Sequence, residues 1–242
     1  YINKNKDKTF AEVPFNEIDN LIYSLLTYVD FTNIVPAFKS KKITLKDAAE
    51  KIKDKKKEHR GIFISDTFKM IQIMKDTKRY QDTLLYNYMK VVNTDMQFGA
   101  MTMKLPDKSI YISFAGTDSS IIGWEEDFKM SYLYPGASQK YASIYLNKAV
   151  SLFDKKVRVG GHSKGGNLSI CAVMNAHFWI RKKVIKITNF DGPGFLKKEI
   201  DSKAYKKIEP KINMYVPKES IIGMLFYNIS DYIVVKSKGI NI

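Results

Sequence analysis

The chain has 242 residues, 45% of them apolar and 13% aromatic, which suits one sizeable α/β domain with a full hydrophobic core. Lysine and arginine exceed aspartate and glutamate by 40 to 25, so the net charge is +15. This excess is spread at +4 over residues 1–60, +4 over residues 61–180 and +7 over residues 181–242, whereas nucleic-acid binders usually concentrate it in one stripe. We therefore expect no nucleic-acid partner; the charge indicates a lysine-rich solvated surface or, alternatively, attraction to an anionic membrane surface.

Residues 1–92 predict a helical N-terminal region that packs on the core and carries no obvious catalytic motif. Apolar residues recur at helical spacing over residues 15–29, which predicts an amphipathic helix. Thr44 and Asp47 resemble a capping box, which opens a second helix. That helix would run into the charged residues 51–60, and further short helices are predicted over residues 67–75 and 83–91.

The periodicity changes at Met96. Residues 96–105 and 109–114 flank Pro106-Asp107-Lys108, whose turn residues indicate a β-hairpin. The elements predicted after the hairpin are a helix over residues 137–153 and strands over residues 157–159, 184–189, 212–216 and 232–235.

Strands that alternate with helices imply a mostly parallel sheet with helices on both faces. The catalytic loops of such sheets lie at the carboxyl ends of the strands. We expect residues 93–242 to form this core and residues 1–92 to form the helical region beside it, with the two making one compact domain.

The most informative stretch is Gly161-His162-Ser163-Lys164-Gly165. A β-branched strand precedes it, and an apolar segment of helix length follows over residues 167–178, which is the context of a nucleophile elbow. A serine at so sharp a turn has a strained backbone, so the positions two before and two after it must be small. The alternative is a Gly-rich turn without chemistry.

Cys171 is the only cysteine, so no disulfide can form within the chain and a reducing compartment is expected. The sequence has no run of about eighteen apolar residues, and its beginning lacks the apolar core of a signal peptide. We expect a cytoplasmic protein. Because Tyr1 is not an initiator residue, we also expect the natural N-terminus to lie upstream of it.

Four motifs occur in a fixed order, at residues 114–118, 123–127, 161–167 and 191–195. Together they resemble the lipase-like α/β-hydrolases: the fungal-type (class 3) lipases and, more closely, a bacterial family of lipase-like proteins with Phe-Arg-Gly-Thr-Asp, Gly-Trp-x-Glu-Asp, Gly-His-Ser-Lys-Gly-Gly-Asn and Asp-Gly-Pro-Gly-Phe. The resemblance covers nearly the whole chain and implies an α/β-hydrolase fold. One departure is Ala115, where that family has arginine. If the arginine holds a nearby carboxylate in the relatives, this chain must do without the pair.

The resemblance implies that Ser163 is the nucleophile. It also implies an oxyanion hole that is formed by Thr117, through its amide and its hydroxyl, and by the amide of Lys164. Two preorganised donors of this kind contribute roughly 3 to 4 kcal/mol each in comparable sites. The alternative for Thr117 is an ordinary turn residue at the end of a strand.

The identity of the triad acid stays open. In the lipases an aspartate follows the strand after next, where this chain has Glu219-Ser220, and the bacterial family has serine at the second of these positions. Asp191, at the end of the strand after the elbow helix, is the other candidate. Asp191 beside Gly192 is equally suited to a structural turn, so the acid is Asp191, Glu219 or neither.

The chain order of the resemblance is serine, acid, histidine, yet no histidine follows His177. The side chain of His162 is expected to point away from the nucleophile, and His59 is expected to be solvated. His177 would lie about 20 Å from Ser163 along a helix that rises 1.5 Å per residue. The catalytic histidine is therefore not present in this chain, and we expect it in a tail beyond Ile242.

These residues predict a serine hydrolase of the lipase or esterase type that cleaves a small-molecule acyl ester or lipid. Trp124 and Phe128, with Tyr132 and Tyr134, are predicted to line the substrate pocket. No cofactor and no metal are expected, because three scattered histidines and one cysteine do not make a metal site. The alternative is a catalytically inactive protein of the same fold that binds a lipid, an anionic membrane or a protein partner.

Overall fold

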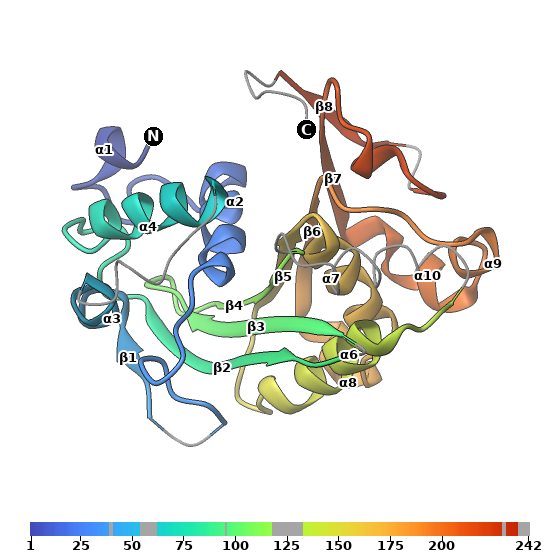
Figure 1. Cartoon of the computed structure of the whole chain (residues 1–242), viewed down its shortest axis with the longest axis horizontal. Helices are drawn as coiled ribbons and strands as arrows, with labels where there is room; N and C mark the ends of the chain where they lie inside the picture. Colours follow the sequence, from blue (N-terminus) through green and yellow to red (C-terminus); the bar gives the residue numbers. More distant parts are fainter. Residues whose placement is uncertain (39–40, 54–61, 95, 118–132, 229–230, 237–242) are drawn as a thin grey trace.

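The computed structural model describes residues 1–38, 41–53, 62–94, 96–117, 133–228 and 231–236. They form one eight-stranded sheet whose strands lie side by side in chain order (Figure 1). Strands β1 to β4 pair with one another in antiparallel order, and from β4 to β8 each strand is parallel to the next. The strands are β1 (Ile43–Thr44), β2 (Leu84–Val92), β3 (Gln97–Lys104), β4 (Ile110–Phe114), β5 (Val157–His162), β6 (Val184–Phe190), β7 (Ile212–Pro217) and β8 (Ile233–Val235).

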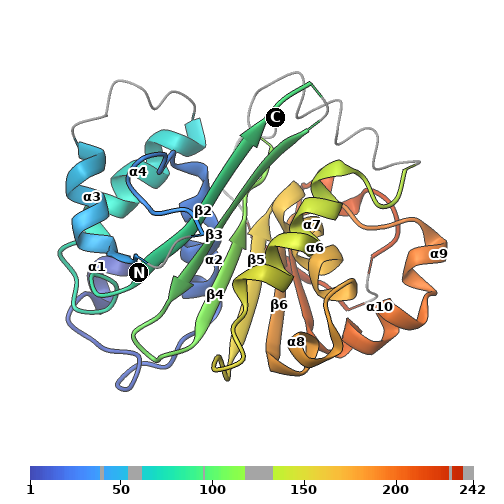
Figure 2. The same ribbon diagram turned by 90° about the horizontal axis from the view of Figure 1, so that it is seen from below.

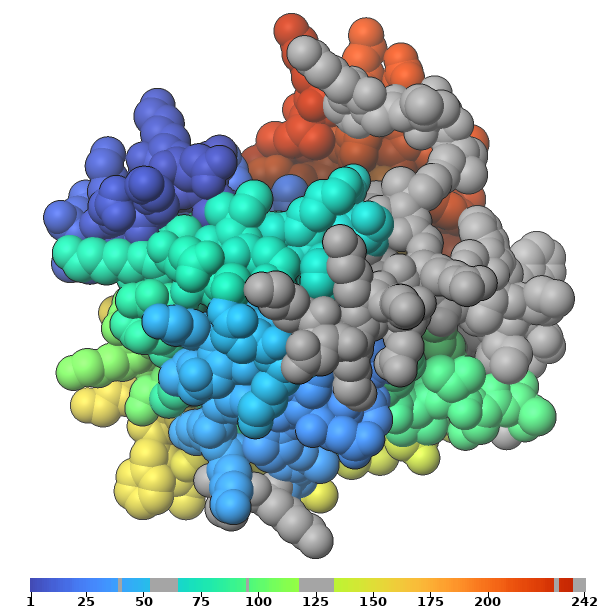
Figure 3. All heavy atoms as spheres, turned by 60° about the vertical axis from the view of Figure 1, so that its left-hand side comes forward, coloured from blue at the N-terminus to red at the C-terminus, as the bar shows by residue number. Residues whose placement is uncertain are grey.

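Helices cover both faces of this sheet, as Figure 2 shows. The helices of the N-terminal region lie on one face, and the blue to teal segments that Figure 3 brings forward belong to them. The other face carries α6, α7, α8 and α10. The helical segments are α1 (Ile2–Asn5), α2 (Glu17–Leu25), η1 (Leu26–Tyr28), α3 (Leu45–Lys53), α4 (Ile62–Met74), α6 (Ala137–Ala149), α7 (Lys164–Met174), α8 (Phe178–Lys183), α9 (Lys197–Ile200), α10 (Lys203–Ile208), η3 (Glu209–Lys211) and η4 (Ile222–Met224).

The alternation of strand β4 divides the core between the two faces. Ile110, Ile112 and Phe114 belong to the apolar cluster that includes α6 and α7, whereas Tyr111 belongs to the cluster beneath the N-terminal helices. This division follows from the period of two in a strand. The strand pairing and this division of the core together confirm the predicted fold class, a mostly parallel sheet with helices on both faces and a helical N-terminal region.

Polar contacts fix α2 and η1 on the sheet. The Asn20 side chain donates to the Thr188 hydroxyl at 2.6 Å, and the Ser24 and Tyr111 hydroxyls are 2.7 Å apart. All four side chains are buried, so these bonds specify one position of α2 along the strands. No helix of the described residues is long and apolar enough to span a bilayer.

Most of the predicted elements are confirmed to within a few residues. The predicted hairpin is the β3–β4 pair, and residues 15–29 form α2 and η1. Thr44 Oγ1 accepts from the Asp47 amide at 3.0 Å, as the capping pattern predicts at the start of α3. The charged residues 54–61 lie outside the described residues.

The helix predicted over residues 83–91 is wrong, since these residues lie mostly in strand β2. Asn87 has a φ of 55°, and the register with β3 shifts between Tyr86 and Met89. This bulge directs Leu85 and Tyr88 into the same buried cluster. A spacing of three residues imitates the buried face of a helix, and a bulge of this kind forms only against a partner strand.

Two helices are shorter than predicted. Helix α6 ends at Ala149 rather than at residue 153, and α7 ends at Met174 rather than at residue 178. The side chain of Asn175 donates to the Cys171 carbonyl at 2.9 Å, which ends α7 by giving one of its last carbonyls a side-chain partner. Cys171 itself is buried, as expected for the apolar helix.

Candidate active site

Ser163 lies between the end of β5 and the start of α7. Its backbone has φ 53° and ψ −134°, a region that side-chain-bearing residues rarely adopt because it is strained. The Ser163 amide donates to the Phe190 carbonyl at 2.8 Å, and the Ser163 carbonyl accepts from the Gly166 amide at 2.8 Å. The strand, the helix and these two bonds together hold the strained conformation.

The two glycines that flank Ser163 allow three backbone segments to meet. A Cβ at Gly161 would lie 2.4 Å from the carbonyl carbon of Gly165, and a Cβ at Gly165 would lie 2.2 Å from the Phe114 carbonyl oxygen. Both separations are far below van der Waals contact. The small residues that the sequence predicts around the serine are therefore required by close packing as well as by the turn.

Thr117 and Lys164 come to the same edge as Ser163. Phe114, the last residue of β4, pairs with Gly161 of β5, and a Cβ at Gly116 would lie 2.7 Å from the His162 carbonyl oxygen. Thr117 is the next residue and is half-buried. Lys164 opens α7, so its amide lies at the positive end of the helix dipole.

The side chain of Lys164 has a contact that the sequence did not predict. It is buried, and its ammonium group donates to the Gln97 carbonyl at 2.9 Å. The same carbonyl accepts from the Ser138 hydroxyl at 3.1 Å. The Lys164 side chain therefore extends back toward β3, and it is the Lys164 amide that lies beside Ser163.

Asp191 follows β6 just as Ser163 follows β5, because the preceding residues, Phe190 and His162, are paired in the sheet. Asp191 also has a positive φ, 58°, and its amide donates to the Tyr215 carbonyl at 2.9 Å. A Cβ at Gly192 would lie 2.3 Å from the Ser163 carbonyl oxygen. The segment that begins at Asp191 therefore packs directly against the backbone of Ser163.

The carboxyl group of Asp191 is held by the segment that follows β7. The Ser220 hydroxyl donates to Asp191 Oδ1, and the Gly223 amide donates to the same carboxyl group. Burial raises the pKa of Asp191 above its ordinary value, and these two hydrogen bonds offset part of that rise. Glu219, the neighbour of Ser220, is exposed. The structure thus brings Asp191, and not Glu219, into the packed edge beside Ser163.

A buried amide network supports the segment after Asp191. Asn189 Oδ1 accepts from the Gly192 amide at 2.7 Å, and the Asn167 side chain donates to the Gly194 carbonyl at 2.8 Å. Gln139 of α6 donates in turn to Asn167 Oδ1 at 2.8 Å. Sequence reasoning missed these roles, although Asn167 is the last residue of the motif that contains Ser163.

His162 does not lie where a general base is needed. Its Nδ1 is 2.7 Å from the hydroxyl of Tyr28 in η1, on the N-terminal face of the sheet. Burial lowers the pKa of His162 to about 4, so the ring is neutral at pH 7. Tyr28 also approaches Gly116, where a Cβ would lie 2.1 Å from the Tyr28 hydroxyl.

The other two histidines, His177 and His59, are not placed beside Ser163 by the described residues either. His177 is exposed beyond the far end of α7, where its amide donates to Asn147 Oδ1 at 2.9 Å. His59 lies outside the described residues. Among the residues that the structure describes, no histidine adjoins both Ser163 and Asp191.

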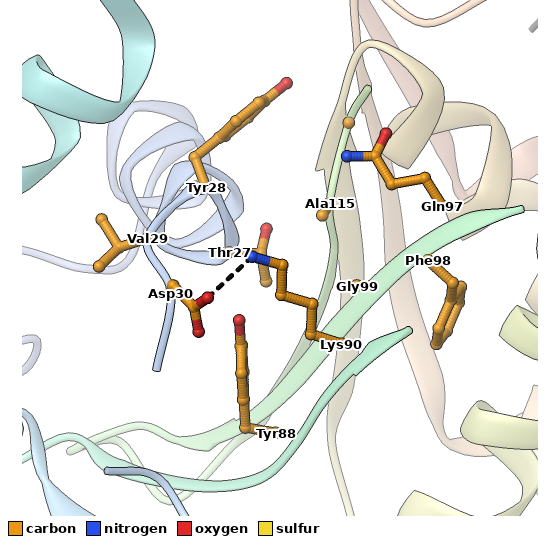
Figure 4. A pocket seen from close by; sticks show the side chains of 11 residues that line it. Thr27, Tyr28, Val29, Asp30, Tyr88, Lys90, Gln97, Phe98, Gly99 and Ala115 are labelled. Atoms are coloured by element: carbon orange, nitrogen blue, oxygen red, sulfur yellow. Dashed lines mark hydrogen bonds and ion pairs between the residues drawn. The ribbon is translucent and has the colours of Figure 1, made fainter. Parts of the chain in front are cut away.

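A cavity of about 70 Å³ adjoins Gly116 (Figure 4). Its walls include Tyr28 and Ala115, and the ion pair between Lys90 and Asp30, with 2.8 Å between Lys90 Nζ and Asp30 Oδ2, lies beside it. Burial favours a higher pKa for Asp30, but hydrogen bonds from Lys90 and Thr32 outweigh it and lower the pKa to about 2. Ala115 contributes only a small side chain to this cavity, and the nearby carboxylate of Asp30 pairs with Lys90.

The predicted substrate-pocket residues Trp124, Phe128 and Tyr132 lie outside the described residues. Tyr134 is described, and its ring packs against Phe195 at 5.9 Å between centroids. The Asn175 side chain donates to the Tyr134 hydroxyl at 3.1 Å. Tyr134 therefore packs against α7 and the segment after β6.

The order of the strands, the helices on both faces and the turn between β5 and α7 are those of an α/β-hydrolase fold, as the sequence predicted. The chain belongs to the Mbeg1-like family, whose model matches residues 74–242. Among solved structures it is similar to M37 lipase, at 18% identity over 86% of this chain and 70% of that chain, with a TM-score of 0.44. It is also similar to a fungal lipase in complex with an inhibitor, at 14% identity over 84% and 73% of the two chains, again with a TM-score of 0.44. No curated protein matches the chain.

Proposed function

We propose that this protein is a serine hydrolase of the lipase or esterase type, which cleaves a small acyl ester or a lipid ester. The observation that carries the proposal is the strained backbone of Ser163, at φ 53° between a strand and a helix. Strain of this kind persists only where the surrounding structure enforces it, and it is concentrated at functional sites. A nucleophile elbow over residues 161–165 would explain this strain, because the strained turn exposes the serine oxygen above the sheet.

In the proposed reaction Ser163 Oγ attacks the carbonyl carbon of the ester and forms a tetrahedral oxyanion. The amides of Thr117 and Lys164, with the Thr117 hydroxyl, stabilise that charge. A general base takes the Ser163 proton and passes it to the leaving alkoxide, and water then hydrolyses the acyl-enzyme. The position of Lys164 at the start of α7 supports its part, because the helix dipole favours negative charge there.

Asp191 is the proposed acid. It is held by Ser220 and Gly223, and the segment after it packs against Ser163, so its carboxyl group is fixed in one orientation. Glu219 is the alternative, and its exposure makes it less suited to orient a buried partner. Ser220 donates to Asp191 and so supports a carboxylate that comes from the neighbouring strand.

The general base is proposed to be a histidine outside the 242 residues. One observation supports this assignment: the two described histidines have other partners than Asp191, since His162 contacts Tyr28 and His177 contacts Asn147. Trp124 and Phe128 remain the proposed lining of the acyl pocket.

A catalytically inactive protein that binds a lipid, an anionic membrane or a protein partner is the second candidate function. The positions of the described histidines favour it, because a serine hydroxyl without a base is a poor nucleophile. The two candidates share the fold and differ only in whether Ser163 reacts.

Labelling with a fluorophosphonate probe tests the proposal. We expect modification at Ser163, located by mass mapping, in the intact gene product. Ser163→Ala should abolish both labelling and hydrolysis of short acyl esters, whereas Ser143→Ala, a matched loss of a helix hydroxyl in α6, should leave both unchanged. Labelling of the intact product but not of the 242-residue chain would support a base outside these residues. Absence of labelling in both would favour the inactive binding protein.

A further inference from the structure

A basic cavity of about 290 Å³ lies on the molecule far from Ser163, between α8 and the segment formed by α10 and η3. No carboxylate is among the described residues that line it. Such a lining suits an anionic group that carries an apolar portion. The lining residues are Phe178, Arg181, Lys182, Lys207, Ile208 and Lys211.

Two lysines join three separate segments of the chain at and beside this cavity. Lys211 donates to the Arg181 carbonyl at 2.7 Å and to the Val184 carbonyl at 2.7 Å, which joins η3 to the end of α8. Lys183 donates to the Leu152 carbonyl at 2.6 Å, which joins α8 to the segment before β5. Residues 150–156, 177–183 and 203–211 therefore form a continuous surface, which we call the basic apolar surface.

This surface concentrates charge that is dispersed in the sequence. The three segments contain nine lysines or arginines and two acidic residues, a net +7 of the chain's +15. Both acids already have partners: the Asp154 carboxylate accepts from the Ser151 amide at 2.7 Å, and Glu209 pairs with Lys206 at 3.1 Å. The remaining cations make this edge attractive to a surface of negative charge.

Large apolar side chains project from the same edge. The exposed fractions are 92% for Phe153, 75% for Leu152 and 65% for Phe178. The Lys182 ammonium lies 5.5 Å from the centre of the Phe178 ring, so apolar and cationic groups alternate over a short distance. Aromatic and aliphatic groups beside lysines suit the boundary between lipid headgroups and acyl chains.

We propose that the basic apolar surface binds an anionic lipid bilayer, with Phe153 and Phe178 entering the headgroup boundary and the cavity holding a phosphate headgroup. The parallel strands begin at this edge, at Val157, Val184 and Ile212, and Figure 2 shows α8 and the segment before β5 at the lower end of the molecule. Ser163 lies at the opposite end of β5, about 20 Å away at 3.3 Å per residue. The docked protein therefore turns its candidate active site away from the bilayer, toward a substrate that reaches it from solution.

Vesicle flotation tests the docking. We expect binding to vesicles that contain phosphatidylglycerol and little binding to pure phosphatidylcholine vesicles. Replacing Lys182 and Lys207 by glutamine should weaken the partition about 25-fold, since each lysine near an anionic surface contributes roughly fivefold. The matched control is Lys46→Gln with Lys51→Gln on α3, which removes the same charge from exposed positions elsewhere and should change the partition less than about threefold. Equal losses in the two double variants, or no binding to anionic vesicles, would overturn the proposal.

A second measurement tests the orientation. Because the only native cysteine is buried, a polarity-sensitive dye can be attached selectively to an introduced cysteine. On anionic vesicles the dye should shift to the blue in Phe153→Cys and stay unchanged in Ile221→Cys, which is exposed near the opposite edge. A shift at position 221 without one at position 153 would mean that the bilayer contacts the Ser163 edge instead. Neither measurement requires turnover, so its outcome is independent of the proposed hydrolase activity.

Discussion

The hydroxyl of Ser220 donates a hydrogen bond to Oδ1 of Asp191. This bond joins the segment after β7 to the residue after β6, beside Ser163. A half-buried carboxyl group that must hold one orientation needs a donor of this kind, because the loss of a hydrogen-bond partner costs about 1 kcal/mol. Ser220 is thereby a positioning residue in the proposed reaction, acting through Asp191.

Replacement of Ser220 by alanine should lower kcat for ester hydrolysis about tenfold with little change in KM, because Asp191 loses orientation while substrate contacts remain. Loss of the Ser220 hydrogen bond should also raise the pKa of Asp191. The acidic limb of the pH profile of kcat should therefore shift to higher pH. Ser220→Thr keeps the hydroxyl and should restore both. An unchanged pH profile in the alanine variant would contradict the positioning role.

Replacement of Asp191 by asparagine should abolish hydrolysis without lowering the stability of the fold. Because burial raises the folded-state pKa of Asp191, its contribution to stability is present at low pH and is lost as the pH rises through the folded-state value. Asparagine can still accept from Ser220 and carries no charge. The variant should therefore be as stable as the wild type below pH 3.8, the ordinary value, and more stable at pH 7, while its hydrolysis is lost.

Urea unfolding at several pH values measures the first part of this prediction, and ester turnover measures the second. Glu219→Gln is the matched control for the carboxylate, because it removes an exposed acid one strand away. Loss of turnover in Glu219→Gln with retention in Asp191→Asn would reverse the assignment of the acid.

The buried ring of His162 should make the protein sensitive to mild acid. Its pKa falls from 6.5 to about 4 on folding, so between these values the unfolded chain binds more protons than the folded chain. Stability is thus lost as the pH falls through this window, by roughly 3 kcal/mol for this residue.

Comparison of wild type with His162→Asn, in which the amide oxygen can still accept from Tyr28, isolates that loss. The slope of unfolding free energy against pH between 6.5 and 4 should be smaller in the variant. His177→Asn, at an exposed histidine, should retain the wild-type slope. Identical slopes in all three proteins would show that His162 is not the titrating group.

Gly165→Ala should destabilise the fold by about 3 kcal/mol, because its Cβ would lie 2.2 Å from a backbone oxygen of Phe114 that cannot move without displacing β4. Gly136→Ala is the control, since the nearest atom to its Cβ would be 3.8 Å away, and it should cost less than about 1 kcal/mol. Denaturant midpoints with unchanged m-values provide the comparison. Equal costs would mean that the packing around the Ser163 turn is not tight.

Local patterns in the sequence were sufficient where an element is set by its own residues. The β3–β4 hairpin follows from apolar runs on either side of Pro106-Asp107-Lys108, and the Ser163 turn follows from its glycines and its neighbours in the chain. Strand β2 was missed because its bulge at Asn87 exists only through pairing with β3. A local pattern cannot encode a contact whose partner is elsewhere.

For the same reason, only some parts of the candidate site could be predicted from local sequence patterns. The sequence by itself determined where Ser163 stands and that a strand precedes it and a helix follows it. It also determined that Thr117 and Asp191 follow the neighbouring strands. Only the tertiary structure decided that Ser220 holds Asp191, that Gln139 braces Asn167, and that dispersed lysines gather on one edge. These contacts join residues that lie far apart in the chain, and they depend on the register of parallel strands and on how helices pack, which no single segment specifies.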